Sequence, residues 1–268
     1  MNMKKIGLGS IAAAGAAALV MGLGTPAMAA PPYTAPVISG PSAVTLPSST
    51  VSKVNVSATF QGAAPTANLK YYWYDAAYAG PSLTLLARNS KIRSSYVSAA
   101  KYAYTNDYSS TAVPGVATGI NFSVNPYTTP GKYRLNLPVT QKGYNPSSTQ
   151  TLFGYKEITV KANTSFSKKR TYATGSPKYG RAFKVKVNAP YYQVGAKVTA
   201  YVKLPGKKKY KKVTSGYLKS SNSSTSKASL KISSKYNKNK ARFYFKVSAA
   251  PYAGSYKTTT YKITVRRY

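Results

Sequence analysis

The protein has 268 residues, a length that suggests two domains of ordinary size or one large one, and it carries 39 Lys and Arg against 3 Asp and Glu, a formal net charge of +36. It contains no Cys and no His, which excludes disulfides, thiolate nucleophiles and the commonest metal ligand and general base. The three acids, Asp75, Asp107 and Glu157, are scattered, so a carboxylate pair or metal site has too few ligands. The composition therefore predicts a protein that is not an enzyme and holds no metal or cofactor.

The amino terminus has the pattern of a signal peptide. Lys4 and Lys5 precede an apolar run over residues 6–23, and Ala27-Met28-Ala29 forms a small-x-small cleavage signal. We expect residues 1–29 to be removed by a cut before Ala30, and the protein to be secreted, extracellular or associated with the cell surface. The alternative is an uncleaved anchor, although the Gly-rich run is marginal for spanning a membrane. No later apolar stretch is long enough to span, so the mature chain is expected to have no transmembrane segment.

Residues 30–162 predict a first β-sandwich. Short runs of strand-forming residues alternate with turn signals such as Gly40-Pro41, Pro114-Gly115 and Pro130-Gly131. About seven short strands per hundred residues, with no convincing helical period, are typical of an immunoglobulin-like sandwich. The expected strands are 44–46, 54–60, 69–74, 82–86, 120–124, 133–139 and 156–160.

An aromatic run in this half is a candidate glycan-stacking site. Tyr72, Trp73 and Tyr74 follow one another on an expected strand. Trp73 is more simply a core residue of such a sandwich, and alternation would then place Tyr72 and Tyr74 on the opposite face. Both interpretations stay open from the sequence alone.

The charge is concentrated after residue 162. Residues 30–162 hold 11 basic and 3 acidic residues, a net charge of +8, whereas residues 163–268 hold 26 basic and no acidic residues. The composition changes at the polar stretch Asn163-Thr164-Ser165, so we expect a domain boundary there. The first domain is mildly basic and the second strongly basic.

Residues 163–268 predict a second β-sandwich. Residues 183–187 alternate apolar and basic with a period of two, which indicates one buried and one solvated face. Both halves close with similar strand pairs, 132–139 with 155–160 and 242–247 with 261–265, which favours two related domains in tandem. The other expected strands of this half are 197–204 and 229–232.

The second half resembles the bacterial immunoglobulin-like repeats of secreted actinobacterial surface proteins. The resemblance rests on Tyr179-Gly180-Arg181-Ala182 leading into strand 183–187, a hairpin from Val198 through Gly206 to Val213, strand 227–232 and the closing pair. It covers about residues 170–268, and residues 31–162 only loosely. It implies an adhesive, spacer or carbohydrate-proximal module without catalysis and names no ligand. The extreme basicity departs from the usual pattern of these repeats.

Clusters of positive charge are the strongest candidate sites. Pro205-Gly206 predicts a turn, so the five lysines that follow are expected at a hairpin tip. The alternative is a merely solvated surface, but solubility needs a net charge of only about 2 to 8 in a small domain. A polyanion would relieve the self-repulsion that such a charge causes. The candidate polyanion-binding residues are Lys207, Lys208, Lys209, Tyr210, Lys211, Lys212, Lys168, Lys169, Arg170, Arg266 and Arg267.

Two further patterns have a chemical and a simpler interpretation. The 26 tyrosines often stand beside lysine, as in Lys209-Tyr210-Lys211, which suits contact with a phosphate and a ring, although Tyr is also a good strand former. Ser165/Lys168 and Ser224/Lys227 have the Ser-x-x-Lys spacing of some acyl-transfer enzymes. Both lie in Ser- and Lys-rich segments that we expect to be turns, so the spacing arises by composition.

The sequence therefore predicts a secreted, non-catalytic binding or adhesion module that associates electrostatically with an anionic polymer. Cell-wall teichoic or teichuronic acid is the first candidate partner, and extracellular DNA in a matrix is the second. A cationic antimicrobial protein is a third possibility, less favoured because no amphipathic helix is available for insertion. Oligomeric state is open.

Overall fold

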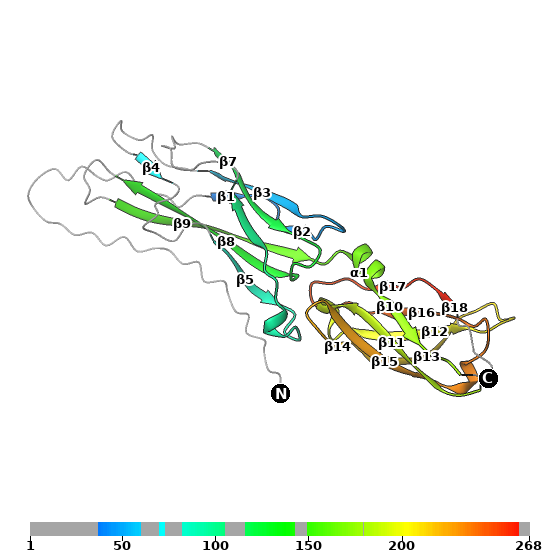
Figure 1. The fold of residues 1–268 in the computed structure, drawn as a ribbon. Coiled ribbons are helices and arrows are strands. Elements are labelled where there is room, and N and C mark those ends of the chain that lie inside the picture. Colours follow the sequence, from blue (N-terminus) through cyan, green and yellow to red (C-terminus); the bar gives the residue numbers. More distant parts are fainter. Residues whose placement is uncertain are drawn as a thin grey trace, which may run out of the picture. The chain divides into compact units, whose positions relative to one another are not determined.

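The computed structural model describes residues 37–59, 70–72, 82–104, 116–142, 149–178 and 180–262. The expected signal peptide, residues 1–29, lies outside the described residues. By its contacts, Pro32–Tyr268 forms one compact unit. Within this unit the strands form four sheets, two built from residues before Asn163 and two from residues after it (Figure 1).

The first sandwich consists of two sheets. One sheet has the strand order β1-β3-β7-β6, and the other has the order β2-β9-β8-β4, with β5 also paired to β8. β8 and β9 are antiparallel over their whole lengths. The strands are β1 (Val37–Ser39), β2 (Ala43–Thr45), β3 (Ser52–Thr59), β4 (Lys70–Tyr72), β5 (Ser82–Arg88), β6 (Lys101–Tyr104), β7 (Val116–Val124), β8 (Gly131–Lys142) and β9 (Thr149–Lys161).

The core of the first sandwich lies between these sheets. Val54 and Val56 of one sheet and Leu135 and Ile158 of the other belong to one buried cluster, which also contains Phe122. Each of these residues alternates with polar neighbours on its strand, so the period of two noted in the sequence sets which face is buried.

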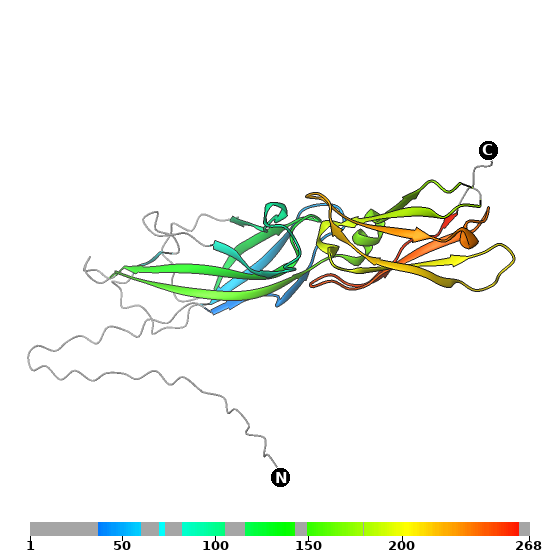
Figure 2. The same ribbon diagram turned by 90° about the horizontal axis from the view of Figure 1, so that it is seen from below.

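The second sandwich also has two sheets. One has the order β10-β11-β15-β14, and the other has the order β13-β12-β16-β17, with β18 also paired to β16. Figure 2 shows the β12–β13 loop, in yellow, projecting beyond its sheet. The strands are β10 (Tyr172–Gly175), β11 (Phe183–Pro190), β12 (Lys197–Lys203), β13 (Lys211–Tyr217), β14 (Lys219–Ser220), β15 (Thr225–Ile232), β16 (Arg242–Val247), β17 (Tyr256–Lys257) and β18 (Tyr261–Lys262).

Alternation is regular in the second sandwich. In β11 Phe183, Val185 and Val187 are buried while the lysines between them are exposed. Phe183 meets Phe243 of the facing sheet edge to face, with ring centroids 6.3 Å apart. The all-β sandwich fold predicted from the sequence is thus confirmed, whereas the exact domain limits remain predictions.

One prediction about this region is wrong. Residues after 163 contain a short α-helix, α1 (Thr164–Arg170), where only strands and turns were expected. Asn163 caps it, because its side-chain oxygen accepts a hydrogen bond from the backbone amide of Phe166 at 2.9 Å. A helix of seven residues is too short for an apolar stripe to repeat, so periodicity could not reveal it.

A third buried cluster joins residues from both sandwiches. It contains Ile92 from the first, Ala162 from the connection and Tyr191, Tyr192 and Val194 from the second. The two tyrosines begin a 3₁₀ turn, η3 (Tyr191–Gln193), that follows β11. The apolar surface that each sandwich leaves uncovered at this end is therefore buried against the other.

Buried hydrogen bonds reinforce this cluster. The side-chain amide of Asn89 donates through Nδ2 to the carbonyl oxygens of Tyr192 and Val194, at 3.3 and 2.9 Å. The Tyr191 hydroxyl lies 2.8 Å from the Thr129 hydroxyl and donates to the Tyr127 carbonyl at 3.0 Å. These donors and acceptors are buried, so breaking a hydrogen bond would leave polar groups without a partner and would cost free energy. The junction between the sandwiches is therefore a specific contact.

Candidate functional site

Three of the five lysines expected at a hairpin tip, Lys207, Lys208 and Lys209, lie in the loop between β12 and β13, whereas Lys211 and Lys212 begin strand β13. β12 and β13 are antiparallel neighbours, and the loop between them turns at Gly206, whose φ of +73° favours glycine. The amide of Lys207 closes the turn by donating to the Leu204 carbonyl at 3.1 Å. Five lysines of this hairpin segment are exposed: Lys207, Lys208, Lys209, Lys211 and Lys212.

Tyr210 departs from the lysines around it. Its side chain is half-buried, and its ring meets the ring of Tyr244 edge to face with centroids 4.8 Å apart. Tyr210 therefore packs on the sheet while the neighbouring ammonium groups point into solvent. The structure separates one sequence-predicted site into a charged tip and an aromatic contact.

The cluster Lys168, Lys169 and Arg170 occupies the last turn of α1, where cations stabilise the helix carboxyl terminus. Arg170 has a structural contact: its guanidinium lies 5.6 Å from the ring centroids of both Phe166 and Tyr127, and it donates to the Tyr127 hydroxyl. Lys168 and Lys169 are exposed. All three cations are exposed, and Arg170 in addition links α1 to Tyr127 of the first sandwich.

The remaining predicted site residues belong to the carboxyl terminus and to the aromatic run of the first half. Arg266 and Arg267 lie outside the described residues, as do Trp73 and Tyr74. Tyr72 belongs to β4, where its backbone is the register partner of Thr140. The glycan-stacking hypothesis for this aromatic run therefore stays a prediction.

The outer face of the β10-β11-β15-β14 sheet brings lysines together that are distant in the sequence. Lys184 of β11 is the register partner of Lys231 of β15, and Lys219 of β14 is the register partner of Lys227 of β15. All four are exposed. Direct cross-strand partners have Cβ atoms about 5 Å apart, so like charges there repel.

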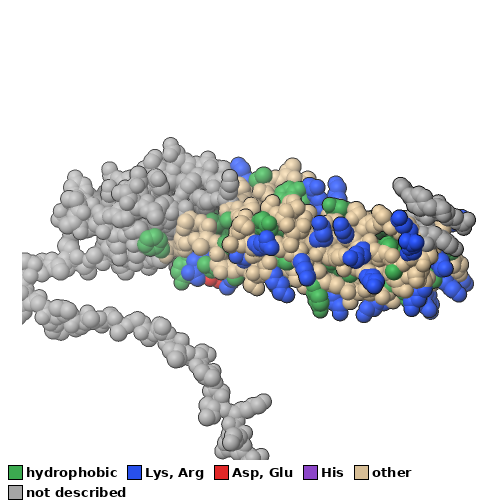
Figure 3. Space-filling model, turned by 60° about the horizontal axis from the view of Figure 1, so that its bottom comes forward, with side chains coloured by type: hydrophobic (Ala, Val, Ile, Leu, Met, Phe, Trp, Pro, Cys, Tyr) green, Lys and Arg blue, Asp and Glu red, His purple; other side chains and the backbone are tan. Residues whose placement is uncertain are grey.

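The outer face of the β13-β12-β16-β17 sheet repeats the arrangement. Arg242 of β16 has Lys203 opposite it on one side and Lys262 opposite it on the other. Lys246 faces Lys257. Among its described residues, the second sandwich therefore contains five cross-strand register pairs in which both members are cations. Figure 3 shows Lys and Arg side chains spread over the visible face rather than gathered at one point.

Of the three acids, Glu157 is the one that the structure describes, and it lies on β9 of the first sandwich. The Glu157 carboxylate pairs with the Lys132 ammonium and, at 2.8 Å, with the Arg134 guanidinium, its cross-strand partner. Hydrogen bonds from these two cations hold the pKa of Glu157 below its usual value. A positive strand face in the first sandwich is thus partly neutralised from within, whereas residues 163–268 contain no acid to do the same.

Sequence reasoning missed the aromatic part of the surface. Tyr201 of β12 and Tyr244 of β16 are register partners, and their rings stack with centroids 4.9 Å apart and an interplanar angle of 7°. The Lys257 ammonium lies 4.1 Å from the Tyr244 centroid. Tyr244 alternates with Arg242 and Lys246, so the sequence predicts that its side chain points outward. Its partner Tyr201 is 43 positions away, and the register of two strands cannot be predicted from one of them.

The two Ser-x-x-Lys pairs differ in setting. Ser165 and Lys168 lie on α1, so the expectation that they occupy a turn is wrong. Ser224 lies in a turn as expected, and its hydroxyl donates to the Asn222 side-chain oxygen at 3.1 Å, while Lys227 is exposed on β15. Neither lysine lines the cavity described next.

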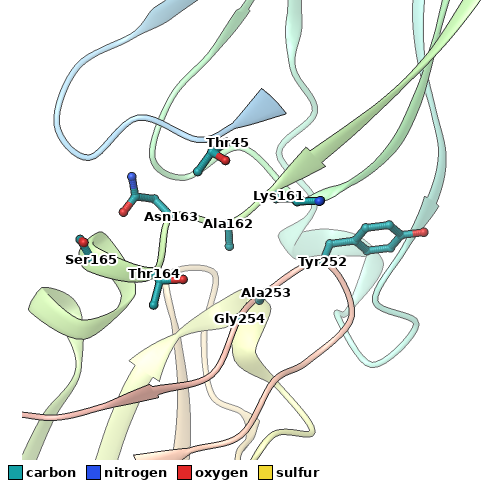
Figure 4. Close-up of a pocket in the computed structure, with 9 residues that line it drawn as sticks. All are labelled: Thr45, Lys161, Ala162, Asn163, Thr164, Ser165, Tyr252, Ala253 and Gly254. Carbon is teal, nitrogen blue, oxygen red and sulfur yellow. The ribbon is translucent and has the colours of Figure 1, made fainter. Parts of the chain in front are cut away.

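A cavity of about 660 Å³ lies where the connection between the sandwiches meets the loop before β17 (Figure 4). Its one polar amide, Asn163, is engaged, because it caps α1 and donates to the Leu46 carbonyl at 3.0 Å. Ala162 closes the same junction through its amide, which donates to the Tyr252 carbonyl at 2.8 Å. The lining residues are Thr45, Lys161, Ala162, Asn163, Thr164, Ser165, Tyr252, Ala253 and Gly254. The lining has one cation, Lys161, and no group of charges that converge on one point. The cavity is therefore a crevice of the junction and not a candidate binding site.

Within the part of the chain that the structure describes, no group of three or more acidic residues is placed to hold a metal ion. A helix long and apolar enough to cross a membrane is also absent from the described residues.

No family model and no curated protein matches the chain. Matched solved structures include the YadV chaperone, with 13% identity, 86% of this chain and 100% of that chain covered, and a TM-score of 0.28. A marsupial T cell receptor has 12% identity, coverage of 87% and 100%, and a TM-score of 0.25. A chimeric titin Z1Z2 tandem has 14% identity, coverage of 89% and 100%, and a TM-score of 0.21. Likenesses at this level support no functional inference.

Proposed function

We propose that this protein is a secreted, non-catalytic module whose second sandwich binds an anionic polymer by charge. The observation that carries the proposal is the set of five cross-strand cation pairs on both outer faces, in a half of the chain that has no acid. Like charges directly opposite each other destabilise a sheet. A bound polyanion supplies the missing negative charge, so binding and folding stabilise each other.

The lysines are spread over the surface rather than gathered in a pocket (Figure 3). They occupy two sheet faces, the hairpin segment at Lys207–Lys212 and the end of α1 at Lys168 and Lys169. Lysine is a compact point charge on a flexible stem and does not impose the planar geometry that Arg does. Such a surface fits a long polymer with repeated charges better than a small ligand with one shape.

Among anionic polymers, wall teichoic or teichuronic acid is the first candidate. The expected signal peptide would deliver the protein to the cell surface, where these polymers are abundant in Gram-positive organisms. The resemblance of residues 170–268 to actinobacterial surface repeats supports the same location. In this proposal the first sandwich is a spacer or faces a further partner, fixed to the second by the buried contacts of Asn89 and Tyr191.

Extracellular single-stranded nucleic acid is the second candidate, and one observation favours it. Tyr201, Tyr210 and Tyr244 lie half-buried among the cations of the β13-β12-β16-β17 sheet, and aromatic rings among lysines suit a polymer that has rings as well as charges.

The test compares two matched sets of five substitutions in the full mature chain. One set changes the hairpin lysines to Gln, and the other changes Lys184, Lys186, Lys219, Lys227 and Lys231 of the opposite sheet to Gln. Each protein is incubated with purified wall polymer, DNA and neutral peptidoglycan at several salt concentrations. The proposal is supported if binding to both polyanions weakens as salt is raised and weakens in each of the two substituted proteins. Retention on neutral peptidoglycan that ignores salt contradicts it.

Dye leakage from vesicles separates the binding proposal from an antimicrobial one. The outer faces of the sheets carry lysines and half-buried tyrosines, and the described helix α1 is seven residues long. We therefore expect adsorption to anionic vesicles without leakage. Rapid leakage at low protein concentration would favour the antimicrobial function.

A further inference from the structure

The outer face of the β13-β12-β16-β17 sheet carries a row of four side chains in which two stacked rings lie between two lysines. In order across the sheet they are Lys212 on β13, Tyr201 on β12, Tyr244 on β16 and Lys257 on β17. Tyr201 is the register partner of both Lys212 and Tyr244. We call these four residues the tyrosine row.

The two rings stack along the direction in which the strands are hydrogen-bonded. Their centroids are 4.9 Å apart, which matches the strand spacing of about 4.8 Å, and they are nearly parallel at 7°. Each ring therefore turns one face to the other. The Lys257 ammonium lies 4.1 Å from the Tyr244 centroid, and Lys212 is the register partner of Tyr201 on β13, the strand on the other side of β12 from β16.

The row is held in place before any ligand arrives. Tyr210 packs edge-on against Tyr244 at 4.8 Å, and the Lys257 ammonium also lies 6.0 Å from the Tyr210 centroid. Tyr244 is half-buried although it lies on the outer face, and this burial is the main cause that raises its pKa. Side chains fixed in advance lose less conformational freedom on binding than free lysines do.

We infer that the tyrosine row is a stacking site for the bases of single-stranded nucleic acid. This inference rests on the proposed function, since the positive surface first attracts the polymer. A base stacks on the β13 side of Tyr201 and extends the existing ring stack, while neighbouring phosphates contact Lys212 and Lys257. Further cations beside the row, Lys203, Arg242 and Lys246, continue the path of the backbone.

The observations favour unstacked bases over two other ligands. In a duplex the base faces are already stacked, so a ring row on a sheet face reaches them only in single strands. A sugar ring carries hydroxyl groups that need hydrogen-bond acceptors and donors around it. The row supplies phenol and ammonium groups and has no carboxylate or amide among its four residues.

The test keeps the charge of the ligand constant and removes its rings. The full mature protein is titrated with an oligothymidylate of about 16 nucleotides, and with an abasic oligomer of the same length and phosphate number. We expect the oligothymidylate to bind about 5- to 150-fold more tightly for each stacked base at equal salt. Equal affinity for the two oligomers would overturn the inference and leave the proposed function intact. No binding of the abasic oligomer or of wall polymer at low salt would overturn the proposed function itself.

Two variants locate the effect. Tyr201→Thr keeps a strand-forming residue and should reduce the oligothymidylate-to-abasic ratio toward one. Lys257→Gln and its matched control Lys186→Gln remove the same charge from opposite sheets, so they should weaken abasic binding equally, whereas Lys257→Gln should lose more oligothymidylate binding. Unchanged ratios in folded variants overturn the inference. A uronate polysaccharide that binds more tightly than oligothymidylate, and loses this advantage in Tyr201→Thr, would also overturn it by assigning the row to sugars.

Discussion

Lys184 on β11 and Lys231 on β15 lie directly opposite each other, both exposed, on the outer face of their sheet. Their ammonium groups have no acid within residues 163–268 to separate them. The sheet thus places repulsion at a position where most antiparallel sheets have an attractive or neutral pair. This pair is the simplest place to measure what the surface costs the folded state.

Lys231→Gln should raise the thermal stability of the free protein by a few tenths of a kcal/mol at low salt, because it removes a direct cross-strand repulsion. Lys186→Gln is the matched control, since Lys186 lies on the same face and has Ser229 opposite it. At about 1 M salt the screening length is roughly 3 Å, and the two variants should melt alike. A Lys231→Gln variant less stable than the control would contradict the repulsion argument.

Changing all five exposed hairpin lysines to Gln should weaken polyanion binding and leave the fold intact. These side chains are exposed on the β12–β13 hairpin, so the folded state does not need them. For duplex DNA, the slope of log K against log[salt] should become shallower by at most about 4 to 5, since each contacted phosphate contributes about 0.9. Binding titrations at four salt concentrations measure the slope, and thermal melting checks the fold. A large drop in melting temperature would show that the hairpin lysines are structural.

The buried tyrosines make the fold sensitive to alkali. Burial raises the pKa of Tyr191 from its ordinary value of 10.0 to about 12, and raises the pKa of Tyr133, Tyr192 and Tyr256 in the same way. A pKa that is higher in the folded state gives stability that is complete below pH 10 and lost as pH rises toward 12. For Tyr191 alone, this loss of folding stability corresponds to about 3 kcal/mol.

Tyr191→Phe isolates this effect. All other titratable groups are common to both proteins, so their contributions cancel in the comparison. Denaturant unfolding at several values between about pH 9 and pH 12 should show a shallower loss of stability in Tyr191→Phe than in the parent. Parallel curves would mean that the Tyr191 hydroxyl is not buried in solution.

Asn89→Ala should destabilise the junction between the sandwiches by about 2–4 kcal/mol, because two buried carbonyl oxygens lose their donor. The matched control is Asn136→Ala. The Asn136 amide donates to the Ser82 hydroxyl at 3.3 Å on an exposed face, so its loss should change stability little. Chemical denaturation gives both values, and equal values would show that the Asn89 contacts do not persist in solution.

The strands that face solvent on one side were predictable from the sequence. The expected strand 242–247 coincides with β16, and 183–187 and 133–139 lie within β11 and β8. In each, a two-residue alternation records which side chains are buried, and this information is local. The short strands β10, β14 and β17 lack enough residues for alternation to appear.

Contacts between strands were not predictable in the same way. The hairpin lysines were found because a turn and its neighbours are adjacent in the chain. The stack of Tyr201 on Tyr244 and the pairing of Lys184 with Lys231 depend on register, which is set by packing across the whole sheet. The junction at Asn89 joins residues more than 100 positions apart, and its polar side chain gave no signal of burial.

The ion pairs of Glu157 with Lys132 and Arg134 have a consequence for acid conditions. Acid unfolding is driven mostly by protonation of carboxylates that are paired in the folded state, and the lowered pKa of Glu157 delays its own protonation to more acidic solutions. The chain has only three carboxylate side chains and no His, so between about pH 5 and pH 9 no side chain of ordinary pKa changes its charge. Apart from the amino terminus, the protein therefore keeps a constant positive charge across this range, and a large change in binding would report ionisation of the polymer.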